Sequence, residues 1–453
     1  MKPSLKIVTL HIALWVGWMP ASQLQAQIPA DSSLIISEPE CQRRIAIDFG
    51  KSRDELLPYI QRYYPQVTDS MLTVWETDGS LEMKIIDGKK RYFSQAARNL
   101  FRINKDARLR KEQIDGAEPL SGYNKVNALH LPEVMRAPRN ESGRPDMPVT
   151  MEVDYTVTVK KSALQPGDTL RCWLPYPREE EKRQQNIELI KTSQSDYQIA
   201  PVEAQQRSIY MEQVVEQPEA VVFGYTLRYT SSPEWHDLNP ASIQPYDTTT
   251  AFYKQYTAER KPHIRFSDRM RKLADSLTMG ETNPLLQARR IFEYIDTTYP
   301  WASAREYSTV PDIPHYVVEQ GHGDCGMVSL LFITLCRIKG IPAKWQSGFM
   351  MHPEAVNLHD WSEIWLEGIG WIPVDVSFGV ADYLNDKSGR LFYASGIDAY
   401  RMIVNNDYSQ PLVPRKRFTR SETVDFQRGE VETQRGNLYF NEWNWHMDVK
   451  YLP

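Results

Sequence analysis

The stretch that decides the fold runs from residue 323 to residue 349 and reads GDCGMVSLLFITLCRIKGIPAKWQSGF. Its apolar run predicts a helix from about Cys325 to Gly340, with Asp324 as the N-cap and Pro342 preventing continuation. The helix is apolar almost all round, so we expect it to be buried within a domain. Its N-terminus, where Cys325 lies, is then the end that can reach the surface.

The position of Cys325 at that N-terminus allows two interpretations. Unpaired backbone N–H groups and the positive end of the helix dipole favour thiolate over thiol, which suits a nucleophilic cysteine. A free cysteine among leucine, valine and isoleucine is more often a small buried hydrophobe. The choice depends on whether the chain also offers a base and a group that orients it.

A second stretch, residues 359–379, offers both partners. It reads HDWSEIWLEGIGWIPVDVSFG and predicts two strands, one opening with His359 and the next carrying Asp375. Cysteine, histidine and aspartate therefore follow one another within about fifty residues. A helix end supplies the thiol and adjacent strands supply the imidazole and the carboxylate, which is the set that nucleophilic catalysis requires.

The geometry of the two strands sets a condition. A tight turn at residues 368–369 would leave Asp375 opposite a residue several positions along the strand from His359, too far for contact at about 3.4 Å per residue. The triad therefore requires a longer loop or a bulge between Glu367 and Gly370, or at Pro373, that shifts the register.

Neighbouring residues have structural interpretations. Asp360 alternates with His359 along the strand, so it points to the opposite face and is expected at the surface or in a structural role. His322 is a rival base, although a loop histidine is more often solvated. The nearby tryptophans are expected to pack in the core and sheet: Trp361, Trp365 and Trp371. A metal site would use the same residue types, but HExxH and CxxC spacings are absent, so we expect neither metal nor cofactor.

Together the two stretches resemble the core of the transglutaminase-like superfamily, a papain-like cysteine enzyme fold. The resemblance rests on the cysteine in its Gly-x-Cys turn, the Gly-Ile-Pro-Ala after the helix, the His-x-Trp strand and the Gly-Trp-x-Pro-Val-Asp strand. It covers about 60 residues strictly and about 170 loosely, and the flanks are similar to those of secreted bacterial members.

The resemblance implies roles for individual residues. Cys325 would be the nucleophile, His359 the general base and acid, and Asp375 the orienting partner. It also implies an oxyanion hole, for which the backbone N–H of Cys325 is one donor. Trp301 occupies roughly the place of a donor tryptophan, and Trp361 is a second candidate for the site wall. The calcium sites of animal enzymes have no counterpart that can be matched.

The first residues read as a secretory signal peptide. Lys2 and Lys6 precede the apolar run of residues 7–19, and cleavage is expected after Ala26. We therefore expect a secreted or periplasmic protein with no membrane span after signal cleavage. The four cysteines are too few for a disulfide scaffold, and whether Cys41 and Cys172 pair stays open.

The rest of the chain divides into four regions by pattern. Residues 27–145 form an accessory α+β region with a helix at 51–64, a hairpin within 75–93 and a linker at 131–148. Alternating strands predict a β-sandwich at 146–235. Residues 236–405 form the catalytic domain, and residues 406–453 form a β-rich segment that could pack against either β region. The predicted class is α+β, a papain-like core preceded by the β-sandwich and the accessory region.

The expected function is cysteine-dependent acyl transfer on peptide or glycopeptide amides through a thioester, with hydrolysis favoured over protein cross-linking. A non-catalytic binding or scaffolding module on the same fold is the alternative from another class. The formal net charge of −5 gives no basic surface for nucleic acid. The partner is expected to be a peptide, protein or glycopeptide, and the oligomeric state cannot be predicted.

Overall fold

The computed structural model describes residues 31–116, 120, 122–217 and 219–453. The predicted signal peptide at 1–26 lies outside the described residues. Within the described part of the chain, no helix combines the length and apolar character needed to cross a membrane.

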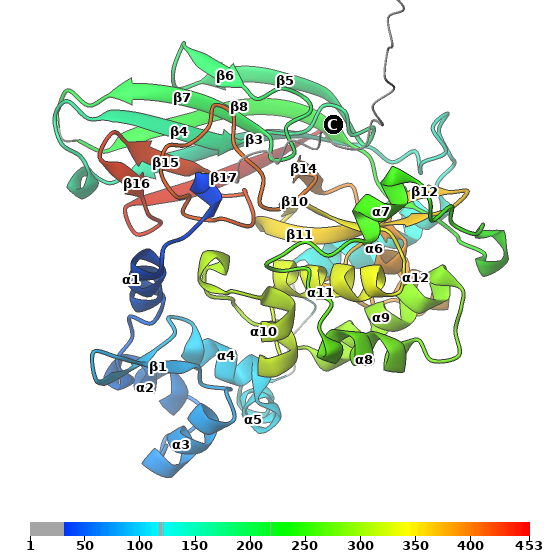
Figure 1. The fold of residues 1–453 in the computed structure, drawn as a ribbon, viewed down its shortest axis with the longest axis horizontal. Helices are drawn as coiled ribbons and strands as arrows, with labels where there is room; N and C mark the ends of the chain where they lie inside the picture. The colour runs from blue at the N-terminus through cyan, green and yellow to red at the C-terminus, as the bar shows by residue number, and fades with distance from the viewer. Residues whose placement is uncertain (1–30, 117–119, 121, 218) are drawn as a thin grey trace, which may run out of the picture. The chain divides into compact units, whose positions relative to one another are not determined.

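The buried helix predicted from the opening stretch is α11 (Cys325–Ile338). Its N-cap is Asp324, whose side chain accepts a hydrogen bond from the backbone N–H of Met327, and every residue from 326 to 337 is buried. The helix lies against strand β11 and against helices α8, α9 and α10 (Figure 1). The core therefore surrounds the helix and leaves Cys325 at its accessible end.

A four-stranded antiparallel sheet covers one side of α11. Its order is β12-β11-β10-β14. The strands are β10 (Ala343–His352), β11 (Ala355–Leu366), β12 (Gly370–Val374) and β14 (Arg401–Asn405). Ile364 of β11 and Ile372 of β12 are paired and face the helix core. The structure confirms the α+β class with an antiparallel sheet beside the helix that begins at Cys325.

Helices cover the other side of α11. Two of them precede it in the sequence, α8 (Asp268–Leu277) and α9 (Pro284–Thr298), and the side chain of Asn283 caps α9, which begins with Pro284. Three more helices complete the layer: α7 (Ala251–Thr257), α10 (Ile313–Gln320) and α12 (Lys387–Arg390). A short two-stranded pair links β9 (Glu234–Trp235) to β13 (Gly396–Ile397).

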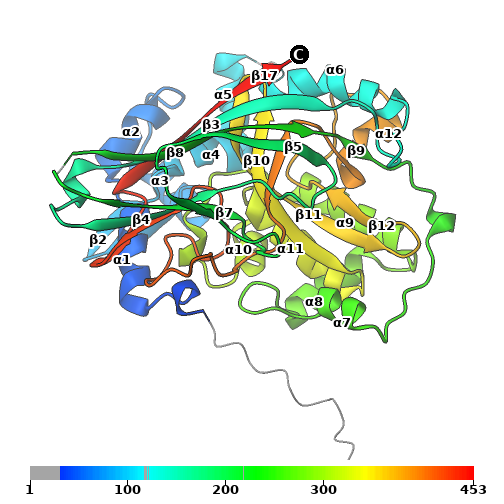
Figure 2. The ribbon, with the colours of Figure 1, turned by 90° about the horizontal axis from the view of Figure 1, so that it is seen from above.

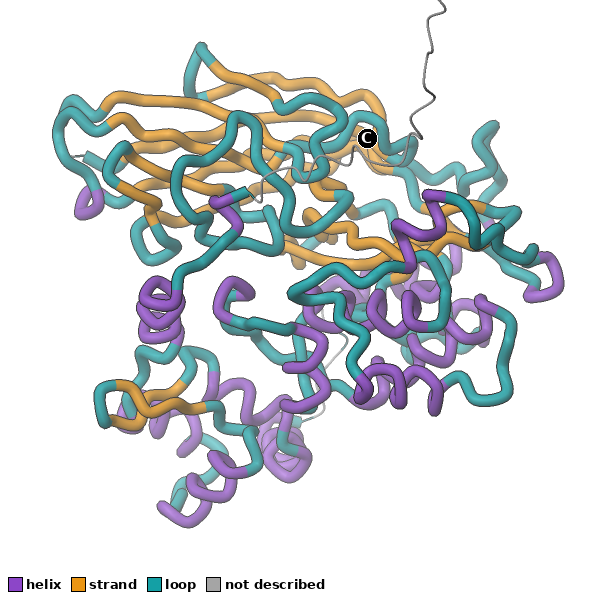
Figure 3. Tube along the Cα trace, viewed as in Figure 1, coloured by secondary structure: helices purple, strands orange, loops and turns teal. Residues whose placement is uncertain are grey.

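Two antiparallel sheets form the β-sandwich, which Figure 3 shows as the strand-rich part of the molecule. One sheet has the order β17-β3-β8-β5 and the other β16-β15-β4-β7-β6. In β3, every second residue from Met151 to Val159 is buried, as the alternation predicts. The early strands are β3 (Val149–Val159), β4 (Thr169–Pro175), β5 (Gln184–Thr192), β6 (Tyr197–Ile199), β7 (Ser208–Val214) and β8 (Val221–Ser231).

The C-terminal segment completes both sheets of the sandwich. Its strands are β15 (Glu430–Thr433), β16 (Gly436–Leu438) and β17 (Trp443–Leu452). β15 pairs with β4, and β17 runs along the whole of β3 (Figure 2). Of the two places the sequence left open, the segment therefore packs against the sandwich. Residues 406–429, which join β14 to β15, are called the connecting segment below.

The N-terminal region has its own hydrophobic core. The hairpin of β1 (Met83–Ile86) and β2 (Lys89–Tyr92) turns at Asp87–Gly88, both with positive φ, as the turn signal predicts. The helices are α1 (Glu38–Asp48), α2 (Arg53–Gln61), α3 (Asp69–Thr77), α4 (Ala96–Ile103) and α5 (Lys105–Asp115). Cys41 of α1 and Cys172 of β4 are both free thiols.

The start of the predicted linker is helical instead. Helix α6 (Gly122–Arg136) contains Pro132, which costs a helix interior about 3 kcal/mol. Leu131 and Val134 are fully buried in the core around α11. Burying two such side chains stabilises the fold by about 3–6 kcal/mol, which offsets the cost of the proline. Tertiary burial thus overrides the local signal.

Candidate functional site

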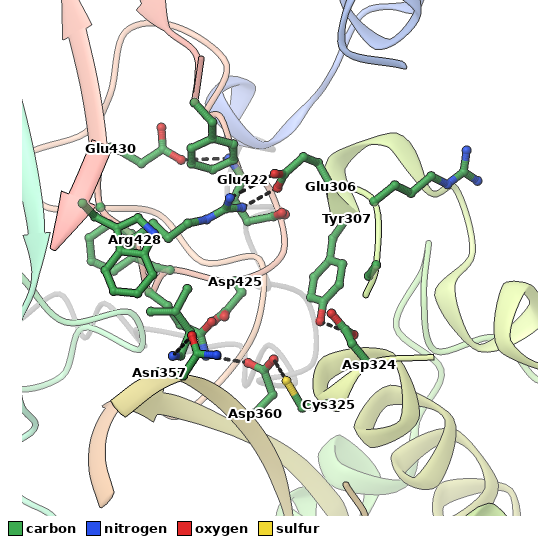
Figure 4. A pocket seen from close by; sticks show the side chains of 18 of the residues that line it. Glu306, Tyr307, Asp324, Cys325, Asn357, Asp360, Glu422, Asp425, Arg428 and Glu430 are labelled. Carbon is green, nitrogen blue, oxygen red and sulfur yellow. Dashed lines mark hydrogen bonds and ion pairs between the residues drawn. The ribbon is translucent and has the colours of Figure 1, made fainter. Parts of the chain in front are cut away.

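Cys325 lines a pocket of about 330 Å³ at the N-terminus of α11 (Figure 4). Its side chain is partly exposed, unlike Cys172 and Cys336, which are buried. The thiol can therefore meet a ligand, whereas the other two cannot. The hydrophobic interpretation of Cys325 does not fit this position.

The pocket walls come from segments that are far apart in the sequence. The loop after α9, the N-terminus of α11, strand β11, the connecting segment and strand β17 all contribute. The residues that line it are Trp301, Ala304, Arg305, Glu306, Tyr307, Asp324, Cys325, Asn357, Leu358, Asp360, Glu422, Asp425, Phe426, Gln427, Arg428, Gly429, Glu430, Phe440 and Trp445. The β-sandwich and the C-terminal segment thus form part of the site.

His359 and Asp375 are brought together by the register of β11 and β12. Ser362 pairs with Val374, so Asp375 follows opposite Trp361, two residues along β11 from His359 and on the same face of the sheet. This register comes from the three-residue loop 367–369, without a bulge. Nε2 of His359 lies 2.8 Å from Oδ2 of Asp375, and both side chains are buried.

The thiol itself contacts the next residue of β11. Sγ of Cys325 donates a hydrogen bond to Oδ2 of Asp360 over 3.2 Å. Cys325 and His359 are both among the described residues, and no hydrogen bond joins them. Nδ1 of His359 also has no hydrogen-bond partner among the residues that the structure describes. The thiol and the His359–Asp375 pair are therefore anchored at adjacent positions of one strand.

Asp360 is not a surface residue, which corrects the expectation from the sequence. It does point away from His359, but that face carries Cys325, and Asp360 is buried. Its Oδ1 accepts a hydrogen bond of 2.8 Å from Nε2 of Gln427, which also donates to the backbone carbonyl of His359 over 2.7 Å. The connecting segment thus holds this part of β11.

Asp360 also shares a hydrogen bond with Asp425, which requires a proton between two carboxyl groups. Three donors surround Asp425: the hydroxyl of Ser347, the amide of Asn405 and the backbone N–H of Phe426. Burial and the neighbouring Asp425 raise the pKa of Asp360 well above its usual range. Asp425 is therefore the ionised member of the pair and Asp360 holds the proton.

The surroundings of Cys325 favour the neutral thiol. Burial and the carboxyl groups of Asp360 and Asp324 raise its pKa well above that of a free cysteine. Burial raises the pKa of Asp324 to about 6, although the hydroxyl of Tyr307 donates to it over 2.6 Å. These effects outweigh the helix N-terminus in the resting site.

His359 and Asp375 have pKa values suited to a neutral base beside a carboxylate. Burial lowers the pKa of His359 although Asp375 opposes it. Burial raises the pKa of Asp375, but His359 and Arg401 outweigh that effect and hold it below its usual value. Imidazole and carboxylate are thus the resting forms.

The two candidate tryptophans are placed differently. Trp301 is 47% exposed and lines the pocket, next to the backbone of Gly323. Trp361 is fully buried away from the pocket, and its indole N–H donates to Gln346 over 2.7 Å. Trp361 is therefore not a wall of this pocket and cannot donate to an oxyanion, which differs from the expectation.

His322 is buried rather than solvated. Burial lowers its pKa to about 4, and it does not line the pocket. Within the part of the chain that the structure describes, no group of three His, Cys, Asp or Glu side chains is arranged to hold a metal ion.

Sequence reasoning missed Asp425, Gln427 and Arg401. Asp425 and Gln427 lie about 100 residues after Cys325, in a segment with no motif of its own. Arg401 reaches Asp375 only because β14 pairs with β10. No short spacing in the sequence signals these contacts.

Comparison with known proteins gives one family match. Residues 271–376 match the sequence profile of the transglutaminase-like superfamily. No curated protein matches the chain.

Solved structures give weak likenesses. A protein provisionally described as a cysteine protease from Cytophaga hutchinsonii is 14% identical, with a TM-score of 0.46 over 68% of this chain and 92% of that chain. The periplasmic domain of TgpA from Pseudomonas aeruginosa is 15% identical, with a TM-score of 0.29 over 51% of this chain and 88% of that domain.

Proposed function

Residues 271–376 carry a transglutaminase-like core, typical of cysteine-dependent enzymes, and from this premise we propose that the chain catalyses acyl transfer on peptide or glycopeptide amides. Cys325 is the nucleophile, His359 the general base and acid, and Asp375 the group that orients His359. Hydrolysis is the favoured outcome, so the protein would act as a peptidase or amidase.

One observation carries the proposal. Nε2 of His359 is bound to Asp375 over 2.8 Å while Nδ1 has no partner among the described residues, and the thiol of Cys325 is anchored one residue along the same strand. A base oriented by a carboxylate with its other nitrogen free is what a thiol nucleophile requires. The partly exposed thiol in a pocket supplies access for a substrate.

The first half of the reaction begins with a change of partner. The S–H of Cys325 leaves Asp360, and Nδ1 of His359 takes the proton. The thiolate attacks the amide carbonyl carbon, an S–C bond forms, and the carbonyl oxygen becomes an oxyanion that the backbone N–H of Cys325 stabilises. The C–N bond then breaks as His359 returns its proton to the leaving amine, which gives a thioester.

The second half releases the acid. His359 removes a proton from water, the hydroxide attacks the thioester carbonyl, and the S–C bond breaks with Cys325 as the leaving thiolate. The proton on His359 returns to sulfur. If an amine replaces water, the same steps form a new amide, which is the transamidase alternative.

A non-catalytic binding module is favoured by one specific observation. The hydrogen bond of Cys325 is made to Asp360 rather than to His359, and its pKa is raised. On that alternative the pocket holds a ligand without turnover.

The test is the alkylation of Cys325 by iodoacetamide as a function of pH, read by peptide mass spectrometry. Cys41, also partly exposed, is an internal control thiol in the same sample. Acylation by p-nitrophenyl acetate is measured in parallel, with Cys325→Ala as the blank. We expect Cys325 of the wild type to form an acyl-enzyme and His359→Ala to abolish it. Equal behaviour of wild type and His359→Ala would favour the binding module.

The proposed location is outside the cytoplasm. It rests on the signal-peptide pattern of residues 1–26. Sequencing the N-terminus of the protein from its native host should show Gln27 as the first residue. A mature chain that retains Met1 would contradict this location.

A further inference from the structure

Arg401 is the first residue of β14, and its guanidinium is fully buried between two carboxylates. Nη1 lies 3.0 Å from Oδ2 of Asp375, and Nε and Nη2 lie 2.9 and 2.8 Å from Oδ2 of Asp398. A single positive charge is thus shared between the carboxylate beside His359 and a second carboxylate behind it.

Asp375 accepts three hydrogen bonds and makes one ion pair. Oδ1 accepts the backbone N–H groups of Ser377 and Phe378 over 3.2 and 3.0 Å. Oδ2 lies 2.8 Å from Nε2 of His359 and 3.0 Å from the positively charged Nη1 of Arg401. Three hydrogen bonds and an adjacent cation hold the carboxylate ionised, so it has no proton to give. Its partner nitrogen, Nε2 of His359, must then be the protonated one.

Resting on the proposed function, we propose that Arg401 is a positioning residue of the acyl-transfer site. It keeps Asp375 ionised and His359 neutral, so that the imidazole carries its proton on Nε2 and keeps the lone pair of Nδ1 free to accept the thiol proton once Cys325 has left Asp360. Arg401 touches neither the thiol nor the pocket, and it acts through Asp375.

The other charged and titratable groups around this centre do not replace Arg401. Asp398 faces it from the strand connection, with His352 3.1 Å from its Oδ1 and the hydroxyl of Tyr393 3.1 Å from its Oδ2. Tyr123 lies near Asp375 from helix α6 and is neutral. The buried Arg183 donates to the backbone carbonyl of Asp398 over 3.0 Å, so a second guanidinium lies beyond Asp398. Arg401 is the permanent cation that contacts the carboxylate of Asp375.

The test is the titration of His359 by ¹⁵N NMR in protein labelled at histidine, with its resonances assigned by their loss in His359→Gln. Measurements use the Cys325→Ala background, in which no acyl group can be transferred. We expect the Nε2–H tautomer with Arg401 in place. Removing the cation in Arg401→Gln should raise the titration midpoint of His359 by about one pH unit. Arg401→Lys keeps the positive charge but lacks the guanidinium that contacts both carboxylates. It should therefore raise the titration midpoint of His359 less than Arg401→Gln does.

Arg337→Gln is the matched control. Arg337 is also buried, but its guanidinium binds the backbone carbonyls of Ala343 and Ala258, away from Asp375. The Arg337→Gln substitution should leave the titration midpoint of His359 unchanged. If Arg401→Gln does not fold, Arg401→Lys decides the question. A proton on Nδ1 in the wild-type centre, or an unchanged midpoint in the folded variant, would overturn the inference.

The outcome is separate from that of the proposed function. An unacylated Cys325 in the wild type would remove the acyl-transfer function, while a titration midpoint of His359 that depends on Arg401 would still establish the effect of Arg401 on His359. Conversely, an acyl-enzyme with a midpoint independent of Arg401 would remove the inference alone.

Discussion

The thiol of Cys325 is bound to the carboxyl group of Asp360, 3.2 Å away, and not to the imidazole one residue earlier in the strand. Alternation along β11 points His359 and Asp360 to opposite faces, and the helix N-terminus lies on the Asp360 face. The resting site therefore separates a protonated thiol from an oriented base. Any reaction of the thiol has to begin by breaking this contact.

Asp360→Asn should make Cys325 more reactive. The substitution removes the oxygen that accepts the thiol proton and an amide N–H can stabilise the thiolate, so the pKa of Cys325 should fall by about one unit. Alkylation by iodoacetamide at pH 7 should then be about tenfold faster, with Cys41 in the same protein as the reference. Slower alkylation would mean that Asp360 itself accepts the proton from sulfur.

Asp375→Asn should reduce acylation of Cys325 by p-nitrophenyl acetate by about 10²- to 10⁴-fold. The asparagine amide donates to Nε2, which forces the imidazole proton onto Nδ1 and removes the lone pair that would accept the proton of the thiol. Asp448→Asn, at an exposed position of β17, is the control for aspartate replacement and should react like the wild type. Comparable rates for the two variants would exclude an orienting role for Asp375.

Glu422→Gln should change how stability depends on pH. Burial raises the pKa of Glu422 to about 8, so the folded state holds a proton that the unfolded state releases above about pH 4.5. This group therefore stabilises the fold at low pH, and that stability is lost as pH rises from about 4.5 to 8.

The Tm of the wild type should accordingly fall more between pH 5 and pH 9 than that of Glu422→Gln. The glutamine can keep the hydrogen bond from the backbone N–H of Val424, which is 2.8 Å long. The expected difference in unfolding free energy at pH 9 is on the order of a few kcal/mol. Parallel pH profiles would show that Glu422 is already ionised in the folded protein.

Gln427→Ala should loosen the connecting segment. The amide of Gln427 donates to Oδ1 of Asp360 and to the carbonyl of His359, and the loss of these two buried hydrogen bonds should cost about 1–3 kcal/mol of unfolding free energy. Denaturant unfolding measures this. Gln194→Ala, whose amide binds only the partly buried Gln213, is the control. A loss no larger than that of the control would contradict the role of Gln427.

The local elements could be predicted because their signals are local. The apolar run of α11, its Asp324 cap and the alternation of β3 each follow from residues within one element. Counting residues along the two strands indicated that His359 and Asp375 can meet only if the connection between the strands differs from a tight turn. The connection is a three-residue loop. Such arguments need only nearest neighbours in the sequence.

The rest of the site depends on contacts between distant segments. Asp425 and Gln427 reach Asp360 because the connecting segment lies over β11, and Pro132 is accommodated in α6 because Leu131 and Val134 are buried in a remote core. Burial also reversed the expected effect of the helix N-terminus on Cys325. Neither packing nor desolvation can be read from a short window of sequence.

The use of the C-terminal residues in the pocket sets the order in which the site can be assembled during synthesis. Cys325, His359 and Asp375 leave the ribosome before residues 422–445, which supply one wall of the pocket and the partners of Asp360. A nascent chain that stops before Glu422 carries Cys325, His359 and Asp375 without that wall. The pocket thus reaches its final form only after β15 and β17 have joined their sheets.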